Sequence, residues 1–87
     1  MKKDLKICFT FLMSGTAYVH VSALATTECW TESGCKDYQL DAGHYFFTYS
    51  VASAGGGVIT ISVGGTVIYS DHFGPGTLSF PPVSRTI

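Results

Sequence analysis

Asparagine is absent from the 87-residue chain, and charged side chains are few. Without asparagine there is no acceptor for N-linked glycosylation. Only 13% of the residues are charged and 46% are hydrophobic, which excludes the highly charged, weakly apolar composition of disordered chains. The formal net charge is −1, so the composition does not favour a polyanion. We therefore do not expect nucleic acid as a partner.

The motifs of the common enzyme classes are missing as well. The chain has no G-x-S-x-G, no G-x-x-x-x-G-K and no H-E-x-x-H. The ionisable candidates among the expected strands and turns are Asp41, His44, Asp71 and His72. In an up-down-up meander His44 begins the first strand and His72 ends the third, so the two histidines should lie at opposite ends. We expect no catalytic residues, no metal site and no cofactor.

Residues 1–25 have the three parts of a secretory signal peptide. Three lysines precede an apolar run at 7–13, and an A-x-A end follows at 23–25. The segment is too short and too interrupted for a stable membrane span. This pattern predicts cleavage, a mature domain of residues 26–87 and a secreted or periplasmic location. Alternating apolar residues at 16–23 support a second interpretation, in which the segment forms an N-terminal strand pair.

The cysteine count agrees with export. Cleavage would remove Cys8 and leave Cys29 and Cys35 as an even pair in an oxidising compartment. A turn at 33–34 would let the chain fold back and close the loop. The sequence therefore predicts a Cys29–Cys35 disulfide. The alternative is a metal site, but a single cysteine pair with no third cysteine or histidine nearby is a poor zinc framework.

Glycine and β-branched and aromatic residues favour strands over helices in this chain. Residues 26–41 are polar and indicate a loop. Alternation predicts strands at 44–52, 58–62 and 66–71, and a short last strand at 77–80. The expected fold is all-β, a small antiparallel β-sandwich or meander sheet in one domain that follows the signal peptide. A domain this small buries little core, so a partner subunit supplying strands, and hence an oligomer, is an open alternative.

The alternation of apolar residues also predicts the turn between the strands at 58–62 and 66–71. A two-residue turn at Gly64 and Gly65 would place Val67 and Tyr69 on the face opposite the isoleucines of the preceding strand. A three-residue loop at 63–65 gathers these apolar side chains on one face. We therefore predict the three-residue loop.

The only tryptophan, Trp30, lies between the two cysteines of the polar segment. One interpretation is that Trp30 packs against the disulfide or caps the sandwich. The other is an exposed aromatic platform that stacks on a sugar or anchors a partner, with Tyr38 assisting if it faces outwards. Loops on a rigid scaffold commonly carry recognition. Trp30 and Tyr38 are therefore the candidate binding residues.

Residues 42–57, which run from Ala-Gly-His-Tyr to a triple glycine, and the alternating strand and glycine turn at 58–65 resemble a recurring element of β-sandwich carbohydrate-binding modules. The resemblance covers under a third of the chain. The later tryptophan-bearing binding loop of that family has no counterpart here, so no binding residue is carried over. The resemblance implies a sandwich, an extracellular setting and a sugar ligand.

These observations predict a secreted, non-catalytic binding or interaction module, with a carbohydrate or a protein as its partner. One alternative is a structural subunit of a surface assembly, completed by strands from a neighbouring subunit. Another is a small secreted inhibitor or toxin. An exposed aromatic patch favours the sugar-binding module, and an exposed apolar sheet edge favours the assembly subunit.

Overall fold

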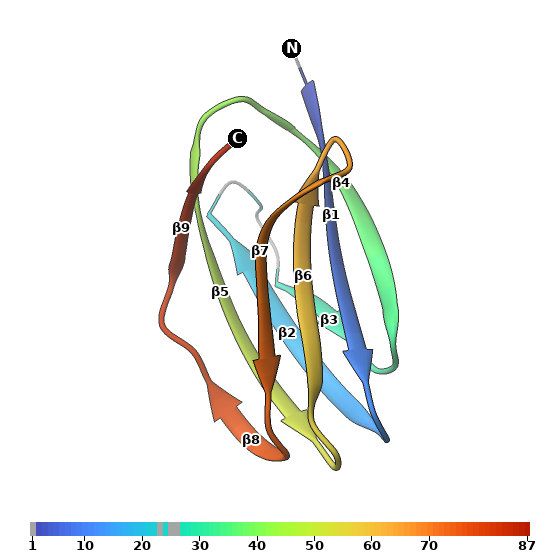
Figure 1. Cartoon of the computed structure of the whole chain (residues 1–87). Helices are drawn as coiled ribbons and strands as arrows, with labels where there is room; N and C mark the ends of the chain where they lie inside the picture. Colours follow the sequence, from blue (N-terminus) through green and yellow to red (C-terminus); the bar gives the residue numbers. More distant parts are fainter. Residues whose placement is uncertain (1, 23, 25–26) are drawn as a thin grey trace.

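The computed structural model describes residues 2–22, 24 and 27–87, and every element in them is a strand (Figure 1). Two antiparallel sheets pack face to face, which confirms the predicted all-β sandwich in one domain. The four-stranded sheet has the order β4-β1-β6-β7, with β4 (Gly34–Asp41), β1 (Lys2–Phe11), β6 (Gly57–Val63) and β7 (Thr66–Phe73). The five-stranded sheet has the order β3-β2-β5, with β3 (Glu28–Trp30), β2 (Gly15–Val21) and β5 (His44–Ser53), and both β8 (Gly76–Ser79) and β9 (Val83–Thr86) pair with β5.

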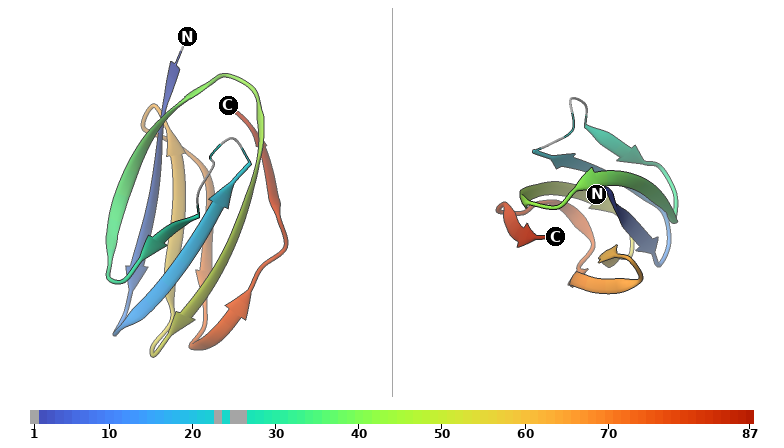
Figure 2. Two further views of the ribbon diagram at one scale, coloured as in Figure 1. Left: turned by 180° about the vertical axis from the view of Figure 1, so that it is seen from behind. Right: turned by 90° about the horizontal axis from the view of Figure 1, so that it is seen from above.

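The N-terminal segment supplies a central strand to each sheet. β1 lies between β4 and β6, and β2 lies between β3 and β5 (Figure 2, left). Both halves of the segment are therefore strands, as the second interpretation has it, but they lie in different sheets and do not pair with each other. The A-x-A end at 23–25 lies largely outside the described residues, so cleavage there stays a prediction. Alternation along the two strands buries one face of each, and the fully or almost fully buried side chains are Leu5, Ile7, Phe9, Ala17, Val19 and Val21.

The polar segment at 26–41 is largely strand, so the predicted loop is wrong. It forms β3 and β4, which lie at the edges of different sheets and are linked by residues 31–33. In β4 the side chains of Tyr38 and Leu40 point inward, whereas those of Asp37 and Gln39 are exposed. An edge strand with one face in water can be half polar, so its composition is difficult to distinguish from that of a loop.

A two-residue turn at Gly64 and Gly65 joins β6 to β7, so the predicted three-residue loop is also wrong. Both glycines have positive φ angles, 56° and 86°, as a type I′ hairpin turn requires. The register then shifts by one residue at a β-bulge, which leaves Ile68 unpaired and places Tyr69 opposite Ile61. The bulge places Tyr69 and Ile61 on one face, as the three-residue loop was expected to do.

The hydrophobic core fills the space between the sheets. The ring of Phe9, on the central strand β1, lies 4.9 Å from the ring of Trp30 and 6.3 Å from that of Phe73, measured between centroids. Gly57 lets β6 approach β1 closely, because a Cβ atom there would lie 1.9 Å from the carbonyl oxygen of Thr10. The N-terminal strands thus form part of the core, with β1 beside β6 and β2 beside β5.

Candidate functional site

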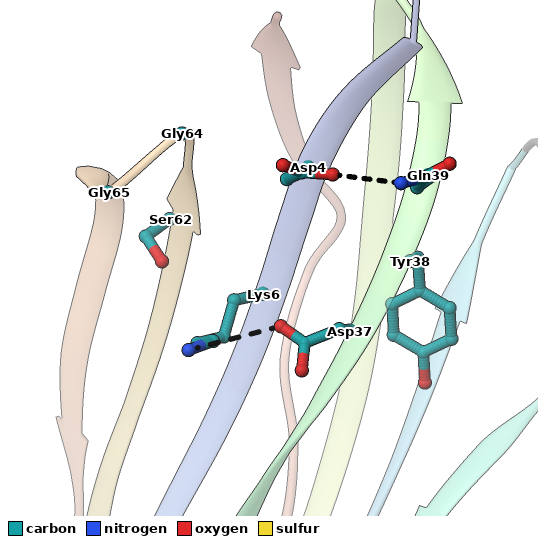
Figure 3. Close-up of a pocket in the computed structure, with 8 residues that line it drawn as sticks. All are labelled: Asp4, Lys6, Asp37, Tyr38, Gln39, Ser62, Gly64 and Gly65. Carbon is teal, nitrogen blue, oxygen red and sulfur yellow. Dashed lines mark hydrogen bonds and ion pairs between the residues drawn. The ribbon is translucent and has the colours of Figure 1, made fainter.

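The outer surface of the four-stranded sheet carries charged side chains that pair with one another (Figure 3). Gln39 Nε2 donates to Asp4 Oδ1 at 3.1 Å, and Lys6 Nζ lies 3.9 Å from Asp37 Oδ1. With Ser62 and the β6–β7 turn, these residues line an open hollow of about 480 Å³. We call this surface the charged face. Exposed ion pairs of this kind contribute little energy. Lys6 is paired with Asp37, and Asp4 is bonded to the neutral amide of Gln39, so the described lining of the hollow offers a ligand no unpaired cation.

The outer surface of the five-stranded sheet has the opposite character. Its outward positions follow from the register, which pairs Tyr18 with Ser50, His20 with Thr48 and Phe46 with Ser84. Among the described outward residues of β2, β5, β8 and β9 there is no Asp, Glu, Lys or Arg. We call this surface the hydroxyl face, and it comprises Thr16, Tyr18, His20, His44, Phe46, Thr48, Ser50, Ala52, Thr77, Ser79, Ser84 and Thr86.

Two shallow hollows follow the strands along the hydroxyl face. The first has a volume of about 240 Å³ and lies where Tyr18, Ser50 and Ser79 adjoin across β2, β5 and β8. The second has a volume of about 430 Å³ and includes Thr16 and Thr77, nearer the β1–β2 turn. Tyr18 is 49% exposed and Phe46 is 50% exposed. The face therefore combines aromatic surface with hydroxyl groups that both donate and accept hydrogen bonds.

Trp30 is a core residue with only 3% of its surface exposed. Its indole Nε1 donates to the carbonyl oxygen of Gly34 at 3.1 Å, and Lys36 Nζ lies 4.9 Å from the ring centroid. The structure thus supports the packing interpretation and corrects the assignment of Trp30 as an exposed platform. The physical reason is the alternation of β3, in which Trp30 opposes the buried Ala17 of β2.

Tyr38, the second candidate binding residue, also points into the sandwich. Its hydroxyl is buried and has no hydrogen-bond partner among the described residues. Burial, and then the nearby carboxylate of Glu28, raise the pKa of Tyr38 to about 12. The phenol therefore stays neutral and faces the interior. Neither candidate from the polar segment is an exposed aromatic platform, because Trp30 is buried and Tyr38 is half-buried, with part of its surface lining the hollow of the charged face.

The disulfide joins Cys8 to Cys35, so the predicted Cys29–Cys35 pairing is wrong. Cys8 and Cys35 oppose each other in neighbouring strands β1 and β4, with Cα atoms 4.1 Å apart. Cys29 is a free thiol in β3, opposite Tyr18 of β2. Alternation thus points Cys29 and Cys35 toward opposite outer surfaces of the sandwich. A disulfide between cysteines 27 residues apart stabilises the fold by about 3–4 kcal/mol in the chain-entropy description.

The ionisable residues singled out in the sequence do not converge. His44 begins β5, where its two ring nitrogens lie 3.0 Å from Thr86 Oγ1 and 2.5 Å from Ser84 Oγ. His72 lies near the end of β7, at the other end of the sandwich (Figure 1). Within residues 2–22, 24 and 27–87, no three His, Cys, Asp or Glu side chains gather in a way that could hold a metal ion.

A polar cluster that the sequence did not reveal ties the two sheets together. The hydroxyls of Tyr49 in β5 and Tyr69 in β7 are 2.8 Å apart, and both lie near Asp71 Oδ2. Burial, followed by the bond to Tyr69, raises the pKa of Tyr49 above its usual range. Arg85 of β9 covers the Tyr69 ring and donates from Nε to the carbonyl oxygen of Ile68 at 2.9 Å. We interpret the cluster as structural, because it links core strands.

The exposed aromatic residues that do form a candidate site are Tyr18 and Phe46, with His20 beside them. Tyr18 and His20 alternate with buried Ala17, Val19 and Val21 along β2. The same alternation is visible in the sequence at 16–23. Because the segment also has the pattern of a signal peptide, the sequence alone does not identify its outward members as surface residues.

Comparisons with known proteins identify no relative. Family models, curated proteins and solved structures all give no match to this chain. In the part of the chain that the structure describes, there is no helix long and apolar enough to cross a membrane. The hydroxyl face itself is the feature of the molecule that points to a function.

Proposed function

We propose that this protein is a non-catalytic extracellular or periplasmic binding module, and that its hydroxyl face binds a neutral carbohydrate. The observation that carries the proposal is the contrast between the two outer surfaces. Asp4, Lys6 and Asp37 stand on the charged face, whereas the described outward residues of the hydroxyl face include no Asp, Glu, Lys or Arg. A ligand for the hydroxyl face must match hydroxyls and aromatic rings.

A sugar has the complementary chemistry. Its C–H face can stack on the half-exposed ring of Tyr18, whose amphipathic side chain suits a partly wet site. Its hydroxyls can exchange hydrogen bonds with Thr48, Ser50 and Ser79, which adjoin in the same hollow. An anionic sugar would find no Lys or Arg among the outward residues of this face, and desolvating its charge would be unfavourable. The expected ligand is therefore neutral.

Two further features support an extracellular module. The Cys8–Cys35 disulfide is typical of proteins in oxidising compartments. The resemblance of residues 42–65 to carbohydrate-binding modules implies a sugar ligand, and this segment forms β5 and β6. Within it, β5 supplies the central row of the hydroxyl face.

The sheet edges favour a binding module over an assembly subunit completed by a neighbour's strand. The β4 edge carries Lys36, Asp37 and Asp41, and charged edges resist strand addition. The β7 edge is interrupted by the bulge at Ile68, whose carbonyl oxygen accepts from Arg85. Both edges of the four-stranded sheet thus have features that discourage pairing with another chain.

Substituting Tyr18→Ala should weaken glycan binding by about 1–3 kcal/mol, the range for an aromatic binding anchor. The fold should survive, because Tyr18 is half exposed and contributes little to the core. A glycan array on the intact protein identifies the sugar, and calorimetry then compares the variant with wild type. Lys6→Ala, on the charged face, is the matched control and should bind as wild type does. Array binding restricted to anionic glycans, or equal losses in both variants, would count against the proposal.

A further inference from the structure

Three turns meet at one end of the sandwich, the lower end in Figure 1. The register brings together the β1–β2 turn (residues 12–14), the β5–β6 turn (54–56) and the β7–β8 turn (74–75). Two large apolar side chains stand adjacent in the first of these turns. Leu12 is 75% exposed and Met13 is 73% exposed, more than any other large hydrophobic residue that the structure describes.

The turn that carries Leu12 and Met13 is held in place by its neighbours. The backbone N–H of Leu12 donates to Gly56 O at 3.0 Å, and that of Ala54 donates to Ser14 O at 2.9 Å. These bonds fix the backbone of the turn, so its two apolar side chains are already on the surface in the unbound protein. They also satisfy polar backbone groups, which lowers the cost of moving the turn out of water.

Charge is sparse at this end. None of the residues in the three turns is ionisable. The ionisable side chains of the adjoining segments are Glu32, in the loop whose Ser33 Oγ accepts from the N–H of Phe11, and His72 near the end of β7. No Lys or Arg is available there to attract an anionic surface, and Glu32 would be repelled by one.

We propose that Leu12 and Met13 insert into the interfacial region of a neutral, zwitterionic lipid bilayer and hold the module weakly at a membrane surface. A specific protein interface buries about 1,200–2,000 Å² in total, whereas this turn offers two projecting apolar side chains. The other exposed large hydrophobic residues, Tyr18, Phe46 and Val67, lie on the sheet strands away from this turn. A bilayer requires no matching pocket, and a penetration of about 5–10 Å suits a turn.

Co-sedimentation with phosphatidylcholine vesicles tests the proposal. The wild-type protein should partition onto the vesicles, and the double variant Leu12→Ser/Met13→Ser should bind at least tenfold more weakly. Val67→Ser removes a comparably exposed side chain far from the turn and should bind as wild type does. Neither site is buried, so we expect both variants to fold. A cooperative thermal unfolding transition in each variant checks this.

Three results would overturn the inference. The first is failure of the wild-type protein to bind phosphatidylcholine vesicles, and the second is binding of the double variant that equals binding of wild type. The third is much stronger binding to phosphatidylglycerol vesicles than to phosphatidylcholine vesicles, which would indicate an electrostatic attachment. The vesicle measurement does not involve sugar, so its outcome is independent of the proposed carbohydrate ligand.

Discussion

Residues 26–87 expressed alone will not fold. Without β1 and β2, the strands β4 and β6 lose the strand that joins them, and β3 loses its only partner. Truncating a single large core side chain typically costs about 2–5 kcal/mol, and a whole domain is stable by only about 5–15 kcal/mol. Seven buried side chains leave with the deleted segment: Leu5, Ile7, Phe9, Phe11, Ala17, Val19 and Val21. Their loss exceeds what a small domain can tolerate.

Circular dichroism and two-dimensional NMR of the full chain and the truncated form test this expectation. The full chain should unfold cooperatively, and the truncated form should give a poorly dispersed spectrum with no thermal transition. A chain lacking residues 83–87 is a suitable control: it loses the edge strand β9 with Arg85 of the polar cluster, but it keeps every central strand and should keep a cooperative transition at lower temperature. A truncated form with dispersed signals and cooperative unfolding would mean that residues 2–21 are dispensable for the fold.

Trp30→Ala should lower the free energy of unfolding by about 3–5 kcal/mol, as for other buried aromatic residues. The substitution leaves a cavity beside Phe9 and removes the hydrogen bond from Nε1 to Gly34. For a domain of this size each kcal/mol lowers Tm by about 4–8 °C, so the decrease should exceed about 10 °C. Trp30→Phe keeps most of the packing, so its free energy of unfolding should lie between those of Trp30→Ala and wild type.

Phe46→Ala is the matched control for Trp30→Ala, because Phe46 is a half-exposed aromatic on the hydroxyl face. Its effect on stability should stay small. Differential scanning calorimetry compares the variants under identical conditions. A Tm for Trp30→Ala close to that of wild type would place this side chain at the surface and restore it as a binding residue.

The strands that the sequence predicted are those in which alternation is unambiguous. Phe47, Tyr49 and Val51 fill one face of β5, and Ile59 and Ile61 do so in β6. The N-terminal strands were harder to recognise, because basic residues, an apolar run and small residues before a polar segment describe a signal peptide equally well. Only the partners of β1 and β2 in space distinguish the two interpretations.

The candidate site depends on information that is not local in the sequence. Pairing Cys8 with Cys35 requires knowing that β1 neighbours β4, and excluding Cys29 requires knowing that β3 belongs to the other sheet. The hydroxyl face likewise combines residues from four strands that no motif links. Trp30 is hard to recognise as a core residue because its segment is polar, and Glu28 and Lys36 occupy inward register positions of β3 and β4 beside the apolar ones.

Disulfide mapping under non-reducing conditions tests most directly whether β1 is part of the folded protein. Free thiols of the native protein are alkylated, and cleavage after Glu28 and Glu32 then separates the three cysteines for mass spectrometry. We predict a cross-linked pair of peptides that contain Cys8 and Cys35, with Cys29 alkylated. A cross-link between Cys29 and Cys35, with Cys8 unlinked or missing, would contradict the fold described here and the hydroxyl face derived from it.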